Sequence, residues 1–302
     1  MDVRRLELLL ALSRLGSMHA VSEVLGVTTS TVSQQIAALA KEVGTPLLEP
    51  DGRRVRLTPA GRRLAGHAVQ ILAAHEAARA DLDPSAEPAG TVRVAGFHTA
   101  IRDTLLPVVH QLRQECPAVR LEIQEQEPPE ALALLERDQV DLALTYDYNL
   151  APAALDPSLE ATPLWESSWS LAVPSRSRRV RGTAVDVIAA FAASDWIVNS
   201  RHLADEHVVR TIAALAGFEP RITQRADSLQ LVQEMITAGL GVGLMPATYP
   251  KTTGISLRRL RAPEPRMRAY ALIRRGRTSW PAPALVLDLL TKRRERLTKT
   301  AR

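Results

Sequence analysis

The feature that most constrains this chain lies near its amino terminus, where two short amphipathic helices are predicted one directly after the other. Ser17 is placed to cap the first helix, and Gly26 to end it in the left-handed conformation that glycine adopts readily. Thr28 is placed to cap the second helix. Two helices joined by so short a turn form a helix-turn-helix, whose second helix is typically the one that enters a DNA major groove.

Each of the two helices has one apolar face, which predicts that this face is buried. In the first helix the face holds Val21, Val24 and Leu25, and in the second it holds Val32, Ile36 and Leu39. Short, uncharged hydrogen-bonding residues occupy the rest of the second helix and its cap, and the candidates for DNA contact are Thr28, Thr29, Ser30, Thr31, Ser33 and Gln34. Such side chains offer directed donors and acceptors to base edges.

A basic hairpin is predicted after the second helix, at the turn dipeptide Asp51-Gly52. Five arginines fall within eleven residues around it: Arg53, Arg54, Arg56, Arg62 and Arg63. Arginines beside a recognition helix favour contact with DNA phosphates, and Arg53 and Arg54 are the candidates for this role. The alternative is a plain three-helix bundle with a solvated arginine face, but the joint pattern favours a DNA-binding wing.

Residues 2–66 resemble the amino-terminal domain of LysR-type transcriptional regulators. The resemblance rests on Gly16-Ser17, on the turn into Thr31-Val32-Ser33, and on the closing run Leu57-Thr58-Pro59-Ala60-Gly61, in this order and spacing. The chain departs from the family pattern at Val21-Ser22, where two alanines are usual, and at Leu48 and Pro50, where phenylalanine and arginine are usual. Ser22 is small enough to keep the helices close, whereas Pro50 removes an expected phosphate contact.

A long helix is expected after the wing. Pro59 suits its first turn, and the following residues alternate spacings of four and three: Leu64, Ala68, Ile71, His75, Ala78 and Leu82. This spacing is typical of a coiled-coil seam, so we expect the helix to pair two chains, with His75 packed in the seam. Residues 83–90 contain two prolines among small and polar residues and are expected to form a hinge.

From residue 91 onward, predicted strands and helices alternate. The first unit has strands at 91–95, 119–123 and 141–145, with helices at about 100–115 and 129–137 between them. This βαβαβ order predicts a parallel sheet. A second unit has expected strands at 168–173 and 195–198 and helices at 203–216 and 228–238. The glycine-containing run 239–246 follows a helix, which excludes a dinucleotide-binding loop because that loop lies between a strand and a helix.

The later part of the chain also resembles LysR-type effector domains, through the helix before Gly239, the run Gly239-Leu240-Gly241 and the apolar strand ending at Pro246. The resemblance implies an α/β effector region of two lobes, similar to periplasmic binding proteins, joined by a coiled-coil linker helix to an all-α winged helix-turn-helix domain. The expected domains are residues 1–58 for DNA binding, 59–90 for the linker helix and hinge, and 91–302 for effector binding. Lobe one would hold about 91–162 and 266–302, and lobe two about 163–265.

Ligands of open α/β sheets bind where the strands end, so the candidate effector residues follow predicted strands. One group precedes a helix whose amino terminus favours an anion: Phe97, His98, Thr99 and Ala100. Thr99 is placed both to cap this helix and to touch a ligand carboxylate, and capping alone is the alternative. The group across the cleft is Asn199, Ser200 and Arg201, where Arg201 suits a carboxylate. Tyr146, Tyr148 and Met245 complete the set, while Asp147 and His98 leave a cationic or pH-sensitive ligand open.

Other features limit the class of protein. The single cysteine, Cys116, excludes an internal disulfide and is expected to be a packed thiol at a helix end. The chain has no apolar run of membrane-spanning length and no signal peptide pattern, so a cytoplasmic protein is expected. Residues 251–302 carry 15 Lys and Arg against three Asp and Glu, and the basic end at 292–296 is expected to be a solvated helix. Contact of this end with DNA or RNA polymerase is the alternative.

A competing enzyme site is not evident in the sequence. His202 and His207 lack a third ligand at metal spacing, and neither a Gly-x-Ser-x-Gly elbow nor a phosphate-binding loop occurs. We therefore expect a transcriptional regulator without catalytic activity, metal or cofactor, which responds to a small-molecule effector such as a carboxylate.

The resemblance implies several partners. These are a second chain bound through the linker helix, a further dimer to make a tetramer, an inverted-repeat operator in double-stranded DNA, and RNA polymerase. Two alternatives stay open. One is a DNA-binding regulator whose effector region works constitutively or through protein partners. The other is a solute-binding protein with an incidental helical head.

Overall fold

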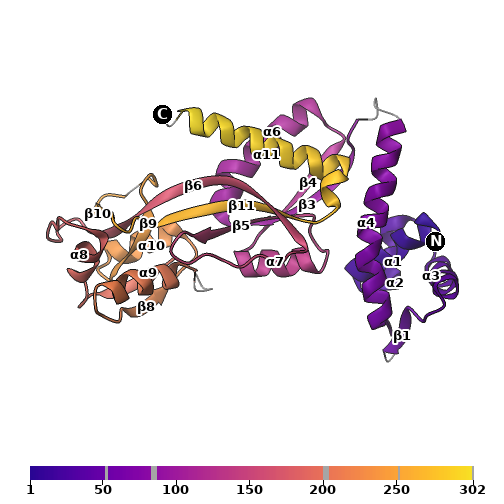
Figure 1. Cartoon of the computed structure of the whole chain (residues 1–302), viewed down its shortest axis with the longest axis horizontal. Coiled ribbons are helices and arrows are strands. Elements are labelled where there is room, and N and C mark those ends of the chain that lie inside the picture. Colours follow the sequence, from indigo (N-terminus) through magenta and orange to yellow (C-terminus); the bar gives the residue numbers. More distant parts are fainter. Residues whose placement is uncertain (52–53, 83–86, 200–203, 251, 301–302) are drawn as a thin grey trace.

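The structure is a computed structural model that describes residues 1–51, 54–82, 87–199, 204–250 and 252–300. A helical domain and one long upright helix lie at one end, and a two-lobed α/β region extends away from them (Figure 1). The helical domain contains α1 (Val3–Leu15), α2 (Met18–Leu25), α3 (Thr29–Val43), β1 (Leu48–Asp51) and β2 (Arg54–Leu57). The upright helix is α4 (Pro59–Leu82).

The predicted helix ends in the helical domain are confirmed. The Ser17 side chain accepts a hydrogen bond from the backbone N–H of Ala20, and the Thr28 side chain accepts one from the N–H of Thr31. Gly26 ends α2 in the left-handed conformation, at φ 62°. The two N-caps fix where α2 and α3 begin, because each satisfies a backbone donor that the helix itself leaves unpaired.

The predicted buried face of α3 is confirmed, and that of α2 is wrong at one position. Val32, Ile36 and Leu39 are fully buried, as is Val21, but the Val24 side chain is 67% exposed. Successive helical residues are about 100° apart around the helix axis. The buried arc of α2 runs from Val21 to Ser22, and Val24 lies on the opposite side of Val21, outside this arc. Ser22 is buried at the helix contact, which fits its small size.

The long helix α4 begins at Pro59 as predicted, but its buried face differs from the expected seam. Ala65, Ala68, Val69 and Leu72 are buried in the hydrophobic core of the chain's own helical domain. Ala68 therefore packs into the helical domain of its own chain and does not face a second chain, which corrects its assignment to the coiled-coil seam. Pairing of two chains through the remaining seam residues stays a prediction.

The α/β region is built on one curled sheet. Its strands are β3 (Gly90–Gly96), β4 (Val119–Glu125), β5 (Leu142–Tyr148), β6 (Leu159–Pro174), β7 (Asp195–Val198), β8 (Arg221–Arg225), β9 (Val242–Pro246), β10 (Ile255–Arg259) and β11 (Arg266–Arg274). They lie in the order β4-β3-β5-β11-β6-β9-β7-β8, with β10 also paired to β6. The predicted parallel βαβαβ unit is confirmed for β3, β4 and β5.

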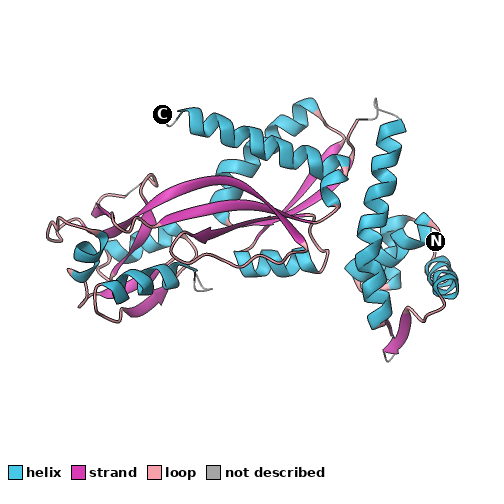
Figure 2. Cartoon of the chain, in the orientation of Figure 1, coloured by secondary structure: helices cyan, strands magenta, loops and turns pink. Residues whose placement is uncertain are grey.

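Two long antiparallel strands join the lobes, and the sequence predicted neither at its full length. The first half of β6 pairs with β11, and its second half pairs with β9 and β10 in the other lobe. Figure 2 shows these ribbons running across the region. The expected strand at 168–173 covers only the end of β6, because the earlier part alternates irregularly and contains Pro163. No strand was predicted at β11.

Helices cover both faces of the sheet. They are α5 (His98–Ala100), the π-helical turn η1 (Ile101–Leu105), α6 (Leu106–Glu115), α7 (Pro128–Glu136), α8 (Ala184–Ala189), α9 (Ala204–Leu215), α10 (Leu229–Thr237), the 3-10 turn η2 (Arg277–Ser279) and α11 (Pro281–Thr300). In Figure 1, α6 and α11 lie on one side of the strands of lobe one and α7 on the other. Cys116 follows α6 as its C-cap residue and is half-buried, as predicted.

The first half of α11 is buried, which leaves the expectation of a solvated helix to the basic end at 292–296, for which it was made. Val286 and Leu290 are fully buried in the core of the α/β region, and Ala282 and Leu289 are nearly so. Lys292 pairs with Asp288 at 2.6 Å, and from Lys292 onward the sequence is rich in charged residues. The basic composition of residues 251–302 made this amphipathic helix difficult to predict.

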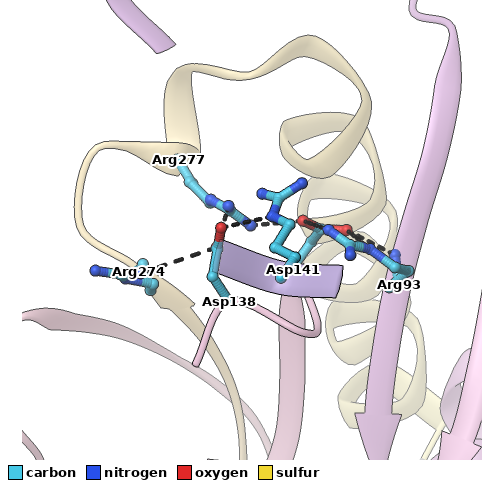
Figure 3. Close-up of polar contacts among 6 residues, drawn as sticks. Arg93, Asp138, Asp141, Arg274 and Arg277 are labelled. Carbon is cyan, nitrogen blue, oxygen red and sulfur yellow. Dashed lines mark hydrogen bonds and ion pairs between the residues drawn. The ribbon is translucent and has the colours of Figure 1, made fainter. Parts of the chain in front are cut away.

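A buried set of charges joins the helical domain to lobe one, and we call it the junction cluster. Its members are Arg14, Arg93, Asp138, Asp141, Arg274 and Arg277, five of which are labelled in Figure 3. Arg14 in α1 contacts the Asp138 carboxylate at 2.6 Å, across the boundary between the two parts of the chain. Asp138 lies just after α7, in the left-handed conformation at φ 62°.

Arg277 lies at the centre of the junction cluster. Its side chain is fully buried, pairs with both Asp138 and Asp141, and stacks at 4.7 Å on the Trp280 ring, which itself packs against the core of the helical domain. Burial lowers the pKa of Arg277 to about 10, against the opposing effect of Asp138, so it stays charged at neutral pH. Burial would raise the pKa of Asp141, but Arg277 and Arg93 outweigh it and hold the pKa below its ordinary value.

Candidate functional site

The start of α3 presents the predicted DNA-contacting residues to solvent. Thr29, Ser30, Ser33 and Gln34 are exposed, Thr31 is half-buried, and Thr28 is exposed at the cap. The Thr28 hydroxyl lies 2.8 Å from the hydroxyls of both Ser30 and Thr31 while it caps the helix. Thr29, Ser30, Ser33 and Gln34 are thus exposed, and their contact with base edges stays a prediction.

The hairpin β1–β2 forms the wing beside this surface. Arg56 pairs with Glu49 across the hairpin at 2.8 Å, and Pro50 lies opposite Val55. Arg62 donates to the Leu57 carbonyl oxygen at 2.7 Å. The two arginines predicted to contact phosphates are not described at their side chains: Arg53 lies outside the described residues, and so does the side chain of Arg54.

A cleft of about 690 Å³ lies between the two lobes. Its walls come from the end of β3 and the helical turns after it, from β5 and β6, and from the residues that follow β7, β8 and β9. A volume of this size suits one small organic molecule. Six of the ten predicted effector residues line it: Phe97, His98, Thr99, Tyr146, Tyr148 and Asn199.

Two predicted effector residues are not in the cleft. Ala100 and Met245 are buried in the hydrophobic core, and the cleft is lined instead by Pro246, one residue beyond Met245. Successive residues of a strand face opposite sides, so a shift of one position exchanges cleft for core. Ser200 and Arg201 lie outside the described residues, and their contact with an effector stays a prediction.

Strand β5 is longer than predicted, and this changes the roles of three residues. Tyr146 and Tyr148 lie within the strand and not after it. Asp147, between them, is not among the lining residues of the cleft, because it forms a two-point ion pair with Arg268 at 2.8 and 2.7 Å. At the other candidate position, Thr99 does not cap a helix, since Phe97 occupies the cap position without a side-chain hydrogen bond.

The sequence reading missed two tryptophans of β6. Trp165 and Trp169 are four positions apart on one strand, so both face the cleft. Together with Phe97, Tyr146 and Tyr148 they form a continuous aromatic wall, with ring centroids 4.8 to 6.2 Å apart. The signal available in the sequence was the even spacing of two tryptophans in a chain that has four.

Four carboxylates in the cleft were also missed: Asp103, Glu127, Glu166 and Asp227. Glu127 accepts a hydrogen bond from the Tyr146 hydroxyl at 2.9 Å. Asp103 accepts two from the Arg102 guanidinium, at 2.7 and 2.8 Å, and this bond raises the pKa of Arg102. The guanidinium of Arg102 lies 5.6 Å from the centre of the Tyr249 ring.

A further acid, Asp205, lies behind the aromatic wall in the first turn of α9. Its side chain is buried, and neither carboxylate oxygen accepts a hydrogen bond of normal geometry from any described residue. Burial raises the pKa of Asp205 to about 8, with Glu127 and Asp227 adding to the effect and the neighbouring Tyr148 hydroxyl opposing it. Asp205 is therefore mostly protonated at neutral pH. Burial likewise raises the pKa of Tyr148.

The described residues show neither a metal-binding group nor a membrane-spanning helix. Within the described part of the chain, no three His, Cys, Asp or Glu side chains are grouped as metal ligands would be. None of the described helices combines the length and apolar character needed to cross a membrane.

Two family models match the chain. Residues 3–62 match the bacterial regulatory helix-turn-helix protein model of the lysR family, and residues 85–295 match the LysR substrate binding domain. The second match alone covers well over half of the chain.

Individual relatives agree with these matches. A protein from Mycobacterium avium described as a probable hydrogen peroxide-inducible genes activator is 32% identical over 230 residues, covering 74% of this chain and 70% of its own length. The transcriptional regulator IlvR of Caulobacter vibrioides is 25% identical over 97% of this chain and 98% of its own. Among solved structures, a full-length OxyR variant from Pseudomonas aeruginosa has a TM-score of 0.74 at 18% identity, covering 98% of this chain and 95% of its own.

Proposed function

Since this chain belongs to the LysR-type transcriptional regulators, proteins that bind DNA and small-molecule effectors, we propose that a ligand in its interlobe cleft controls how its winged helices hold an operator. The observation that carries the proposal is the presence, in one chain, of an exposed uncharged recognition surface on α3 and a 690 Å³ cleft between two lobes. The junction cluster connects the part that bears the first to the part that bears the second.

In this proposal, base readout rests on Thr29, Ser30, Ser33 and Gln34, with Thr28 and Thr31 fixing the start of the helix. Arg53 and Arg54 at the wing supply contacts with phosphates, which give affinity without sequence information. Two chains paired through α4 present two recognition helices to an inverted repeat, and two such dimers form a tetramer. The protein acts in the cytoplasm, where its operator and RNA polymerase are.

The effector works by shifting a population. A ligand moves the oligomer toward one geometry only to the extent that it binds that geometry more tightly than the other. The cleft is bounded by both lobes, so a ligand that contacts both favours their closed arrangement. Closure then alters the spacing of the winged helices, and with it DNA bending and the contact with RNA polymerase.

Footprinting tests this proposal. The purified full-length protein is bound to the DNA upstream of its own gene, with and without a ligand that raises its melting temperature. The expected result is a protected region whose length or internal cleavage changes with the ligand. A ligand bound at 100 times its dissociation constant stabilises the protein by about 2.7 kcal/mol, so occupancy is checked independently. An unchanged footprint at full occupancy contradicts the coupling and favours a constitutive regulator.

Wing contact has its own test. We expect the double variant Arg53→Ala with Arg54→Ala to lower DNA affinity and to reduce the slope of affinity against salt, because fewer counterions are released. Thr29→Ala should weaken binding to the operator more than to unrelated DNA. If the double arginine variant leaves both affinity and salt slope intact, phosphate contact by the wing is wrong.

A further inference from the structure

The helical domain and α4 are packed against one end of lobe one in the same chain. A Cβ placed on Gly276, at the start of η2, would lie 3.2 Å from Cγ of Gln70 in α4. A Cβ placed on Gly66 of α4 would lie 3.8 Å from Nη2 of Arg274, at the end of β11. The Trp280 ring packs against the hydrophobic core of the helical domain. Helix α4 therefore packs directly on the end of lobe one.

Asp138 is the point at which the two parts meet through charge. Its carboxylate pairs with Arg14 of α1 at 2.6 Å. The same carboxylate pairs with Arg277 of η2 and contacts Arg274 of β11 at 3.9 Å (Figure 3). The side chain of Arg14 is 18% exposed and that of Asp138 is 4% exposed, so water and salt screen their attraction only weakly. One carboxylate thus holds a guanidinium from the helical domain and two from lobe one.

The surfaces that Asp138 joins would repel each other without it. Arg14 from the helical domain would then face Arg274 and Arg277 from lobe one. Burial lowers the pKa of Arg277 most, and the positive charges of Arg14 and Arg274 lower it further, in keeping with their mutual repulsion. A placement that moved Arg14 away from Asp138 would leave buried charge without its partner, which is costly. The ion pair therefore favours one placement of the helical domain on lobe one.

Helix α1 fixes the direction of the recognition helix α3. Leu9 of α1 and Val32 of α3 are fully buried in one hydrophobic core. On the surface, Arg5 of α1 donates through Nε to Oε1 of Gln35 at 3.0 Å. Arg5 also pairs with Glu42, two helical turns further along α3. Because α3 is held to α1 both in the core and along its surface, its direction follows the placement of α1.

We propose that Asp138 and Arg14 are positioning residues for operator binding, although neither belongs to the predicted DNA-contacting surface. Their ion pair holds the helical domain on lobe one as a single body. The effector lobes then fix the direction of α3, and with it the separation of the two DNA segments that the two dimers of a tetramer bind. This role rests on the proposed function, from which it takes the tetramer and the operator.

Distances within one chain test the docking itself. Spin labels are attached through Glu23→Cys in α2 and Glu136→Cys in α7, two exposed positions, in full-length protein whose single cysteine is removed by Cys116→Ser. An excess of unlabelled protein dilutes the labelled chains, so only distances within one chain contribute. Pulsed electron paramagnetic resonance should show one narrow distance distribution, which Arg14→Met or Asp138→Asn broadens. A broad distribution before either change, or a narrow one in both variants, overturns the proposal.

Matched variants separate docking from folding. Asparagine tolerates the left-handed conformation of Asp138, so Asp138→Asn removes the charge and keeps the backbone. Arg14→Met leaves every charge of lobe one in place, so one junction variant remains if Asp138→Asn does not fold. Arg14→Lys keeps the positive charge and should keep the narrow distribution. Arg4→Met removes an exposed pair with Glu7 on the same helix and should change nothing.

The spacing of the operator tests the consequence for DNA binding. The sequence protected upstream of the protein's own gene is rebuilt with about 5 base pairs, half a helical turn, inserted between the segments bound by the two dimers. The insertion turns one segment to the opposite face of the DNA, so the affinity of the unaltered protein should fall by at least about tenfold. With Arg14→Met or Asp138→Asn, the fall should be about twofold or less, because the helical domains are no longer held to the lobes.

Binding to one dimer's segment alone provides the control, because the junction variants should bind it as the unaltered protein does. A loss of affinity that is equal for every DNA would mean that the junction affects only folding, and the positioning role would be wrong. The same conclusion follows if the insertion costs the variants as much affinity as it costs the unaltered protein, and the proposed function then still stands. If the unaltered protein binds none of this DNA, the proposed function and the positioning role fall together.

Discussion

Two buried aspartates of this protein, one in the junction cluster and one behind the cleft, are kept in opposite protonation states. Asp141 is held ionised, because Arg93 and Arg277 donate to it at 3.0 and 2.5 Å. Asp205 is equally buried, but no arginine in the described part of the chain donates to it, and burial raises its pKa to about 8. The first carboxylate is neutralised by fixed partners and the second by a proton.

The difference separates a carboxylate that stabilises the fold, Asp141, from a carboxyl group that can change its protonation state, Asp205. A buried charge with complete partners has one stable state, and removing a partner leaves an uncompensated charge. A buried acid that has a tyrosine hydroxyl beside it in place of an arginine gains or loses a proton near neutral pH, and its pKa depends on the charges nearby. Three predictions test this contrast, in order of expected size.

The largest effect is expected for Asp141→Asn. Loss of this carboxylate takes away the described partner of Arg93 and leaves Asp138 as the one carboxylate of the junction cluster beside the buried Arg277, so the free energy of unfolding should fall by about 3–5 kcal/mol. Chemical denaturation measures it. The control, Asp288→Asn, removes an exposed pair with Lys292 and should cost less than about 1 kcal/mol. If both variants lose the same small amount, the junction cluster does not stabilise the fold.

Asp205→Asn should stabilise the protein, with an effect that depends on pH. The native Asp205 keeps its proton up to about pH 8, whereas the unfolded one loses it near 3.8. Between these values the unfolded state binds fewer protons, so wild-type stability falls by about 1.4 kcal/mol per pH unit from this group. Asparagine removes that slope, and its advantage should reach roughly 2–4 kcal/mol at pH 8.

Denaturation curves at pH 5, 6, 7 and 8 check this second prediction. The stabilities of wild type and Asp205→Asn should approach each other at pH 5 and separate steadily as pH rises. Parallel profiles for the two proteins would mean that Asp205 is ionised in the native state. Asp205 would then resemble Asp141, and the contrast would disappear.

The smallest effect is expected for Arg14→Met, which breaks the only described ion pair that α1 makes with lobe one. A hydrogen bond to a charged group contributes about 1.5–3 kcal/mol, and the loss should appear at the interface between the two parts. In calorimetry, we expect the single unfolding transition of the wild type to divide partly into two. Arg4→Met, which breaks the exposed pair with Glu7 on the same helix, should leave the transition unchanged.

Local features of the structure were predictable, and long-range ones were not. The caps Ser17 and Thr28 depend on residues within three positions, so the sequence shows them directly. The junction cluster brings Arg14 together with Arg277, which no local pattern connects. The protonation of Asp205 depends on burial among other elements and is likewise a tertiary property.

The candidate cleft was predicted in place but only partly in composition. Phe97 and Asn199 follow strand ends as predicted and line the cleft, whereas Tyr146 lines it from within β5. Strand β6 was predicted too short, which left out Trp165, and an uncertainty of one residue placed Met245 in the cleft when it belongs to the core. A one-residue error on a strand reverses the face, so predictions at strand ends are the most fragile.

Strand β11 has one further consequence. Met267, near its start, lines the cleft, and Arg274, at its end, belongs to the junction cluster. At about 3.3 Å per residue, one uninterrupted span of roughly 23 Å of backbone separates the two. Strand β6, which pairs with β11 along its first half and with β9 and β10 along its second half, carries this ordered backbone onward into the other lobe. Arg274 contacts Asp138, the carboxylate that also holds Arg14 of α1, so a single strand runs from the cleft to the contact with the helical domain.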